Sequence, residues 1–89
     1  MIHHSTYRDM LRHESWRKKR QEILDRDRHR CRNCGRTDQL QVHHRHYLRV
    51  RFTGHKVAPW CYPGKSLITL CETCHKAGHA LYAIPTYTI

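Results

Sequence analysis

The stretch Cys71-Glu72-Thr73-Cys74-His75-Lys76-Ala77-Gly78-His79 places two kinds of metal ligand on one short segment. Its Cys-x-x-Cys pair has a counterpart upstream, Cys31 and Cys34, and four thiolates are the ligand set of a closed structural zinc site. His75 and His79 are four residues apart, so on a helix they share one face and can hold one ion together. Cys74 lies about 100° round that helix from His75 and points to a different site. The stretch therefore predicts one helix that serves two metal ions.

A histidine doublet, His43-His44, lies between the two cysteine pairs and offers a further ligand to the second ion. It precedes a strand, loop and strand that lead back to the helix, which favours a shared metal site over the alternative of a solvated or core-capping histidine pair. Adjacent residues of a regular strand point to opposite faces, so both histidines can serve one site only if the strand ends or twists there.

The size and composition of the chain also favour a metal staple. A single domain of 89 residues with 38% hydrophobic residues is near the size at which a core alone gives marginal stability. Zinc is favoured over disulfides because the chain starts with a polar segment rather than a signal peptide, and no segment is long enough to span a membrane. We expect a cytoplasmic chain with reduced thiols, in which the fifth cysteine, Cys61, is a buried or idle thiol.

The middle of the chain carries positive charge with no negative charge beside it. The net charge is +10, and no acidic residue stands between Asp38 and Glu72. Such a field attracts polyanions, either nucleic acid or an acidic membrane face. The plainer alternative is a solvated basic loop. We expect the basic side chains of this stretch to contact phosphates, namely Arg45, Arg49, Arg51, Lys56 and Lys65.

The expected order of elements is helices, knuckle, strand, loop, strand, knuckle, helix. Ser5-Thr6 can cap a short helix over residues 7–12, and Ser15 a longer one over 15–25, in which Trp16 anchors an apolar stripe with Ile23 and Leu24. The further expectations are strands at 40–43 and 67–70, an irregular loop at 45–65 and a helix at 71–82, which Pro85 ends. The tail, residues 84–89, can form an edge strand or pack on the core.

These motifs resemble those of the HNH endonucleases, in particular the small stand-alone kind with a four-cysteine zinc found in phage and bacterial genomes. The resemblance runs from about Tyr7 to His79. It rests on Val42-His43-His44-Arg45-His46-Tyr47 and on Ser66-Leu67-Ile68-Thr69-Leu70-Cys71-Glu72-Thr73-Cys74-His75, with Tyr7, Trp16, Arg20 and the run 26–31 upstream. It implies an α+β, zinc-stapled ββα-metal finger with N-terminal helices. The single domain would comprise a basic helical lead-in at 1–30, a core at 31–82 and a tail at 83–89.

The resemblance also implies roles for single residues. His44 corresponds to the general base, His43 and His75 to metal ligands, and His79 to the extra ligand of three-histidine, colicin-type members. Ser66 stands where the family has its central Asn, which is a departure. The implied activity is metal-dependent hydrolysis of phosphodiester bonds in DNA, by nicking or double-strand cleavage. The catalytic ion would be Zn²⁺, Ni²⁺, Mn²⁺ or Mg²⁺, with three imidazoles better suited to Zn²⁺ or Ni²⁺ than to Mg²⁺.

The expected partner is duplex DNA, within a larger DNA-processing machinery of a bacterial or phage-infected cell and with no membrane. The oligomeric state stays open. The main alternative is a non-catalytic, zinc-containing module that binds nucleic acid and has a degenerate HNH site, which the serine at position 66 favours. A zinc-stapled protein-interaction domain is a third alternative, and the charge pattern gives it no support.

Overall fold

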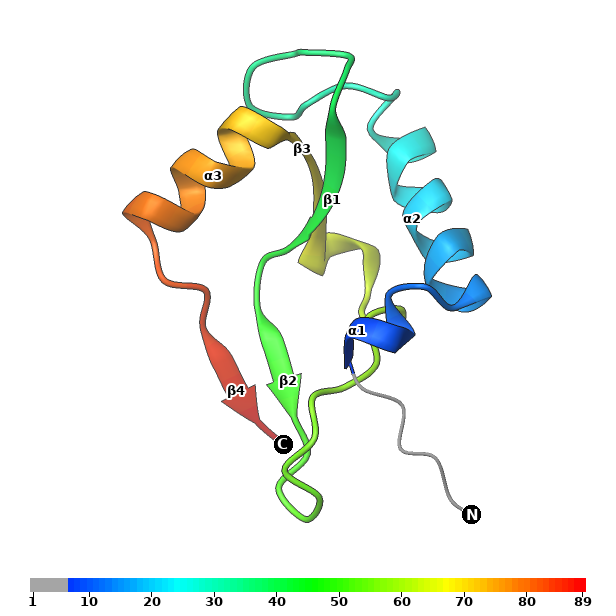
Figure 1. The fold of residues 1–89 in the computed structure, drawn as a ribbon, viewed down its shortest axis with the longest axis vertical. Coiled ribbons are helices and arrows are strands. Elements are labelled where there is room, and N and C mark those ends of the chain that lie inside the picture. Colours follow the sequence, from blue (N-terminus) through cyan, green and yellow to red (C-terminus); the bar gives the residue numbers. More distant parts are fainter. Residues whose placement is uncertain (1–6) are drawn as a thin grey trace.

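The computed structural model describes residues 7–89, which form a small α+β arrangement with two separate two-stranded sheets (Figure 1). The elements follow one another in this order: α1 (Tyr7–Met10), α2 (Glu14–Arg26), β1 (Leu40–His44), β2 (Tyr47–Arg49), the 3-10 turn η1 (Gly64–Ser66), β3 (Leu67–Cys71), α3 (Glu72–Leu81) and β4 (Thr86–Thr88). None of the described helices is long and apolar enough to cross a membrane.

Strands β1 and β3 form an antiparallel pair that carries one candidate ligand of each set, His43 on β1 and Cys71 on β3. Leu40 lies opposite Cys71 and His44 opposite Leu67. Helix α3 follows β3 without a loop, and the Cys71 thiol caps it by accepting the backbone N–H of Cys74 at 3.4 Å. Because the cap is itself a cysteine of the second knuckle, the start of α3 and the candidate zinc site are built from the same residues.

The hydrophobic core lies between α2 and the β1–β3 pair, and α3 covers the other side (Figure 1). Trp16, Ile23 and Leu24 are buried on α2, with exposed fractions of 6%, 3% and 6%. The expected apolar stripe and the role of Trp16 as its anchor are therefore confirmed. Tyr62 and Leu67 complete the central cluster.

A buried carboxylate ties the end of α2 to both β3 and the first knuckle. Asp27 accepts hydrogen bonds from Arg26 at 2.9 Å, from Arg32 at 2.9 Å and from the backbone N–H of Thr69 at 3.0 Å. Burial alone would raise the pKa of Asp27, but these donors hold it well below the usual range. Asp27 is therefore a fixed anion that sets the position of the chain entering Cys31.

Several expected boundaries were wrong. His13, rather than Ser15, caps α2, because its Nδ1 accepts the Ser15 N–H at 3.0 Å. Helix α1 stops at Met10, and the expected Ser5-Thr6 cap lies outside the described residues. The stretch 45–65 is not wholly irregular, since it contains β2, whose partner is the tail strand β4. The tail thus forms an edge strand, parallel to β2.

Candidate metal centres and the hollow beside them

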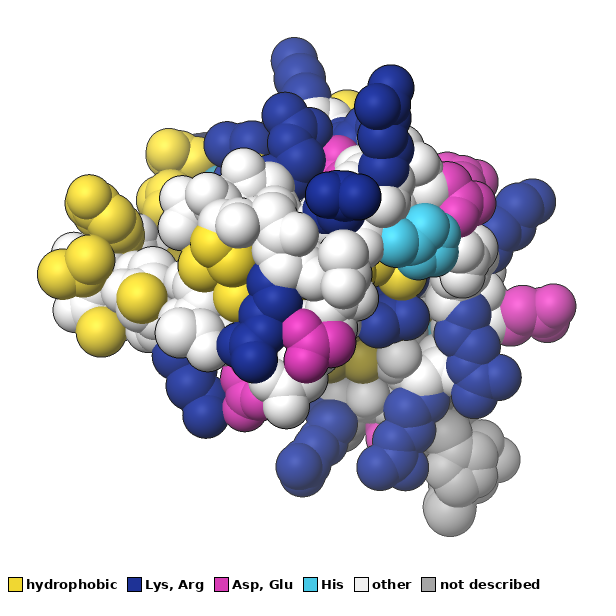
Figure 2. Space-filling model, turned by 90° about the horizontal axis from the view of Figure 1, so that it is seen from above, with side chains coloured by type: hydrophobic (Ala, Val, Ile, Leu, Met, Phe, Trp, Pro, Cys, Tyr) yellow, Lys and Arg dark blue, Asp and Glu magenta, His cyan; other side chains and the backbone are white. Residues whose placement is uncertain are grey.

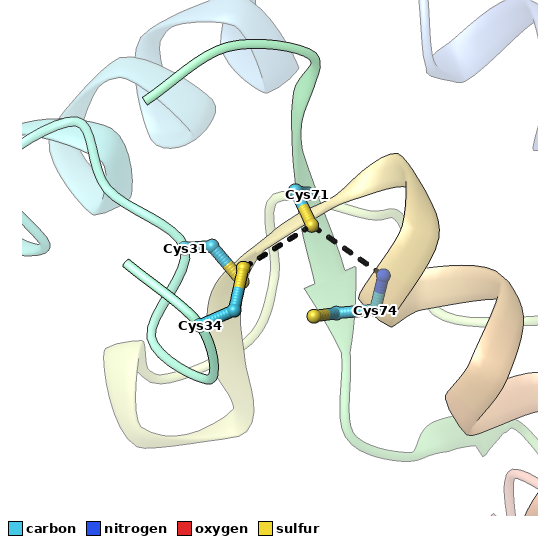
Figure 3. A group of neighbouring side chains, drawn as sticks. All are labelled: Cys31, Cys34, Cys71 and Cys74. Atoms are coloured by element: carbon cyan, nitrogen blue, oxygen red, sulfur yellow. Dashed lines mark hydrogen bonds between the residues drawn. The ribbon is translucent and has the colours of Figure 1, made fainter. Parts of the chain in front are cut away.

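Four thiols from three parts of the fold meet at one point, as Figure 3 shows. Cys31 and Cys34 come from the turn after α2, Cys71 ends β3, and Cys74 lies in α3. Their sulfurs lie within 4.8 Å of one another, with 3.6 Å between those of Cys34 and Cys71. Four Zn–S bonds of about 2.3 Å in a tetrahedron separate the sulfurs by about 3.8 Å. The cluster therefore fits a structural metal such as zinc.

The surrounding backbone favours the thiolate form that a metal requires. Burial disfavours the Cys31 anion, yet backbone hydrogen bonds from Cys34, Cys71 and Asn33 lower the pKa of Cys31 to about 6. The pKa of Cys71 is also lowered, chiefly by the N–H of Cys74 at the start of α3. These hydrogen bonds favour the thiolate at two of the four candidate ligands, Cys31 and Cys71, whereas at Cys74, despite a hydrogen bond from Asn33, the neighbouring thiols raise the pKa.

Cys61, the fifth cysteine, lies apart from this cluster. Its side chain is exposed, so of the two alternatives expected for it the structure excludes the buried thiol.

Gly35, which ends the first knuckle, has a φ of 83°, the positive value that a tight turn at this point needs.

Three imidazoles form a second cluster on the β1–α3 side of the fold. The ligand nitrogens of His43, His75 and His79 lie within 4.8 Å of one another, and the Nε2 atoms of His75 and His79 are 2.9 Å apart. Imidazoles bound at about 2.0–2.1 Å round a tetrahedron would separate their nitrogens by roughly 3.4 Å. His43 and His75 are half-buried and His79 is exposed, so one side of the cluster is open to solvent. The donor set fits a divalent ion with free coordination positions.

Gln41 supports this cluster, and the sequence reasoning missed it. Its side-chain oxygen is hydrogen-bonded to Nδ1 of His75. An amide oxygen only accepts, so His75 carries its proton on Nδ1 and offers Nε2 to an ion. The signal was present in the sequence, because Gln41 and His43 are two apart on a strand and therefore share a face.

Two imidazoles of the histidine cluster, those of His43 and His75, have a lowered pKa, which favours their neutral form. Burial, followed by the charges of His75 and His79, lowers the pKa of His43 to about 4. Burial and then His79 also lower the pKa of His75. Neutral imidazole is the form that binds metals, so protons compete little with an ion at this site.

Beside this cluster lies a hollow of about 170 Å³. Both histidines of the doublet line it, together with His75, Trp16, Tyr7 and Tyr47. Neighbouring residues of a regular strand face opposite ways, but β1 ends at His44, so the alternation need not hold for its ring. The two rings can therefore border the same hollow.

The ring of His44 is held by contacts on several sides. Its Nε2 donates to the carbonyl oxygen of Pro59 at 2.9 Å, and the ring stacks on Trp16 and Tyr47 with centroid distances of 5.1 and 5.4 Å. Because a carbonyl only accepts, this bond leaves Nδ1 as the proton acceptor of the neutral ring. Burial lowers the pKa of His44 further than the Pro59 carbonyl raises it, and the charges of His46 and Lys56 add to the lowering.

Ser66 is buried in η1 and acts on the doublet through its main chain. Its carbonyl oxygen accepts the N–H of Arg45 at 2.8 Å, which fixes the chain directly after His44. Arg26 braces the turn by donating to the carbonyls of Gly64 at 2.6 Å and Leu67 at 2.8 Å. The role expected for the Ser66 hydroxyl stays a prediction.

The five basic residues expected at phosphates differ in their surroundings. Arg45, Arg49, Arg51 and Lys65 are exposed, whereas Lys56 is half-buried. The Lys56 ammonium lies over the ring of Tyr47 at 4.3 Å and over that of Tyr7 at 5.2 Å, and both rings border the hollow. Lys and Arg side chains cover much of the face in Figure 2, with hydrophobic side chains gathered at one side.

No protein-family model, curated protein or solved structure matches this chain. The case for a function therefore rests on the arrangement of the side chains and on the resemblance of the motifs.

Proposed function

We propose that this chain is a metal-dependent endonuclease of the HNH type, with β1, β3 and α3 as its ββα-metal finger and DNA as its substrate. One observation carries the proposal. Three histidines that can hold an ion lie beside a fourth, His44, whose ring is fixed with one nitrogen free to accept a proton, and His43, His44 and His75 line the same hollow. Hydrolysis of a phosphodiester needs both functions next to each other.

In this proposal each side chain has a separate task. A divalent ion on His43, His75 and His79 would supply Lewis-acid stabilisation of the phosphate and of the leaving oxygen. Nδ1 of His44 takes a proton from the attacking water, while its Nε2–H stays bonded to Pro59 and stabilises the imidazolium that forms. Gln41 keeps His75 in the tautomer that can bind an ion.

The charge pattern supports a duplex of nucleic acid as the substrate. Arg45, Arg49, Arg51 and Lys65 are exposed on the acid-free stretch between Asp38 and Glu72, and Arg45 comes directly after His44. Phosphate contacts position a protein on DNA without reading sequence. We therefore propose a nuclease that binds duplex DNA through its backbone, within phage or bacterial DNA processing.

A second candidate is a nucleic-acid-binding zinc module without catalysis. Two observations favour it, the serine at position 66 and the exposed fraction of His44, which is only 5%. A ring packed so closely on Trp16 and Tyr47 can also serve as part of the core.

A plasmid assay separates the two candidates. Zinc-loaded protein is incubated with supercoiled plasmid, alone and with Mg²⁺, Mn²⁺, Ni²⁺ or added Zn²⁺. We expect nicked or linear DNA with at least one of these ions, and no conversion by His44→Ala under the same conditions. Intact plasmid with every ion, together with salt-dependent binding of the same DNA, would support the non-catalytic module instead.

A further inference from the structure

Phe52 is the most exposed of the large hydrophobic side chains that the structure describes. Its exposed fraction is 98%, against 74% for Leu81 and 73% for Tyr82. An aromatic ring in water loses the stabilisation that burial would provide, which is about 25 cal/mol for each Å² of apolar surface. A ring held outside the fold in this way contributes little to its stability and is free to contact another molecule.

The backbone on both sides of Phe52 is held by hydrogen bonds. The chain leaving β2 turns back on itself. Arg49 and Lys56 form an isolated antiparallel β-bridge through their backbones, and the N–H of Val57 donates to the carbonyl of Leu48 at 2.7 Å. Within the turn, Val50 donates to His55 at 2.9 Å and Gly54 donates to Val50 at 2.8 Å. Figure 1 shows this hairpin projecting beyond β2 at one end of the molecule. Phe52 therefore projects from an ordered hairpin tip.

The charges around the ring indicate what it meets. Arg51 precedes Phe52 and is exposed, and Arg49 and Lys56 flank the base of the hairpin. No acidic residue stands between Asp38 and Glu72. Exposed arginines on the same hairpin as an exposed apolar ring match the surface of a nucleic acid, whose bases lie between two charged backbones.

The hairpin follows directly from β2, the strand whose first residue lines the hollow. Tyr47, the first residue of β2, lines the hollow, and Lys56 returns to lie over the Tyr47 ring at 4.3 Å. Phe52 is five residues beyond Tyr47, so the chain can carry it at most roughly 16 Å from that residue, at about 3.3 Å per residue of extended chain. On a duplex with a rise of about 3.4 Å, this reach is at most about five base pairs.

We propose that Phe52 is a wedge that inserts between stacked base pairs of the DNA bound at the hollow. This inference rests on the proposed function, because it requires DNA to be bound there. Insertion unstacks one base step and bends the duplex, so steps that unstack easily, such as TA and CA, are bound best. The wedge gives a backbone-binding nuclease a preference for deformable sites without hydrogen bonds to base edges.

The test uses duplexes that carry one 2-aminopurine, a base whose fluorescence rises when it is unstacked. The label is moved step by step along the duplex, and each sample is checked on a denaturing gel so that cleaved strands are discounted. We expect the full-length protein to raise the fluorescence at one step, and Phe52→Ala to abolish the rise and weaken binding about tenfold. Phe52→Trp should retain both. Because the side chain is almost wholly exposed, the melting temperature should be the same for all three proteins.

Arg51→Ala is the matched control. It removes a cation beside Phe52, so it should weaken binding and flatten its salt dependence but still raise the fluorescence at saturating protein. Equal fluorescence with Phe52→Ala and the wild type would overturn the wedge and leave the proposed DNA binding intact. Absence of DNA binding by the wild type would overturn the proposed function and the wedge with it. Phe52-dependent binding to phosphatidylserine vesicles, with no rise at any labelled step, would show that the ring inserts into membranes instead.

Discussion

The four-cysteine cluster and the three-histidine cluster share helix α3 but differ in ligand number, exposure and surroundings. The cysteine cluster has four soft ligands, and two of them, Cys31 and Cys71, are buried. The histidine cluster has three ligands, one of which, His79, is exposed, and it borders a hollow. Closed four-ligand sites are typical of structural metals, and open three-ligand sites of catalytic ones.

The difference indicates how a small chain can divide its candidate metal ligands between folding and chemistry. The cysteines join three segments, namely the turn after α2, the end of β3 and the start of α3. The histidines lie on β1 and α3, which the β1–β3 pair and the cysteine cluster already hold together. The first cluster should therefore control folding, and the second should control chemistry without controlling folding.

Loss of a cysteine ligand should have the largest effect. Cys71→Ser removes a candidate metal ligand and the thiol cap of α3. If the metal is zinc, a structural site contributes about 10–16 kcal/mol, comparable to the whole stability of a small domain. We expect about one tightly held zinc per wild-type chain and no cooperative thermal transition in the variant. Cys61→Ser, at an exposed thiol outside the cluster, should melt like the wild type. A metal-free preparation with an unchanged transition would remove the structural role from the cysteines.

The next largest effect should separate the base from the ligands. His44→Ala and His44→Gln should lower kcat by about 10²- to 10⁴-fold with little change in metal affinity, because a general base acts in the transition state. His79→Ala should lower the affinity for the catalytic ion as well, while retaining the structural zinc. Calorimetric titration of the ion and cleavage kinetics measure the two quantities. Wild-type cleavage by both His44 variants would direct the search to His43 and His46.

A smaller effect is expected at Gln41, behind the histidine cluster. Gln41→Ala removes the acceptor for Nδ1 of His75, and loss of such a partner reduces metal affinity about 10- to 100-fold. Gln21→Ala is the matched control, since its amide donates a hydrogen bond to Asp25 on the same helix, α2, at 2.9 Å. Titration of each variant with Ni²⁺, with structural zinc retained, measures the change. Equal affinity in the two variants would mean that the histidine cluster is not organised by this bond.

The smallest effect concerns the exposed basic loop near the histidine cluster. Arg49→Ala or Arg51→Ala should weaken DNA binding a few-fold on unrelated sequences and reduce the log–log salt slope by about 0.9, as expected for one lost phosphate contact. Lys76→Ala serves as control, because Lys76 pairs with Glu72 on α3 at 3.0 Å. Fluorescence anisotropy over a range of salt gives both quantities. Loss of binding to one sequence alone would indicate that these side chains read bases.

Local spacing allowed much of the two clusters to be predicted. Residues four apart on a helix share a face whatever the rest of the fold, so His75 and His79 had to lie together once α3 formed. The same reasoning applies to Trp16, Ile23 and Leu24 on α2, which are buried as expected. The Cys-x-x-Cys pairs are likewise local, since each knuckle closes within four residues.

Contacts between distant segments were missed where their partners have no pattern of their own. Nothing in the sequence relates Pro59 to His44, yet its carbonyl decides which nitrogen of that ring is free. The pairing of β2 with β4 joins residues 47–49 to 86–88, and both strands are too short to show a period. One local feature was missed as well. His13 caps α2 with a ring nitrogen, and histidine is not among the residues usually expected at a helix N-cap.

By itself, the sequence determined which candidate metal ligands this protein has and which of them lie on the same helix face. It also determined a basic loop between the two knuckles and a thin core around Trp16. Only the tertiary structure decided that both rings of the histidine doublet border one hollow, that Gln41 orients His75, and that Phe52 projects from a braced hairpin. The reason is physical. Helical periodicity acts over a few residues, whereas the orientation of a ring depends on hydrogen bonds and packing from segments that only the folded chain brings together.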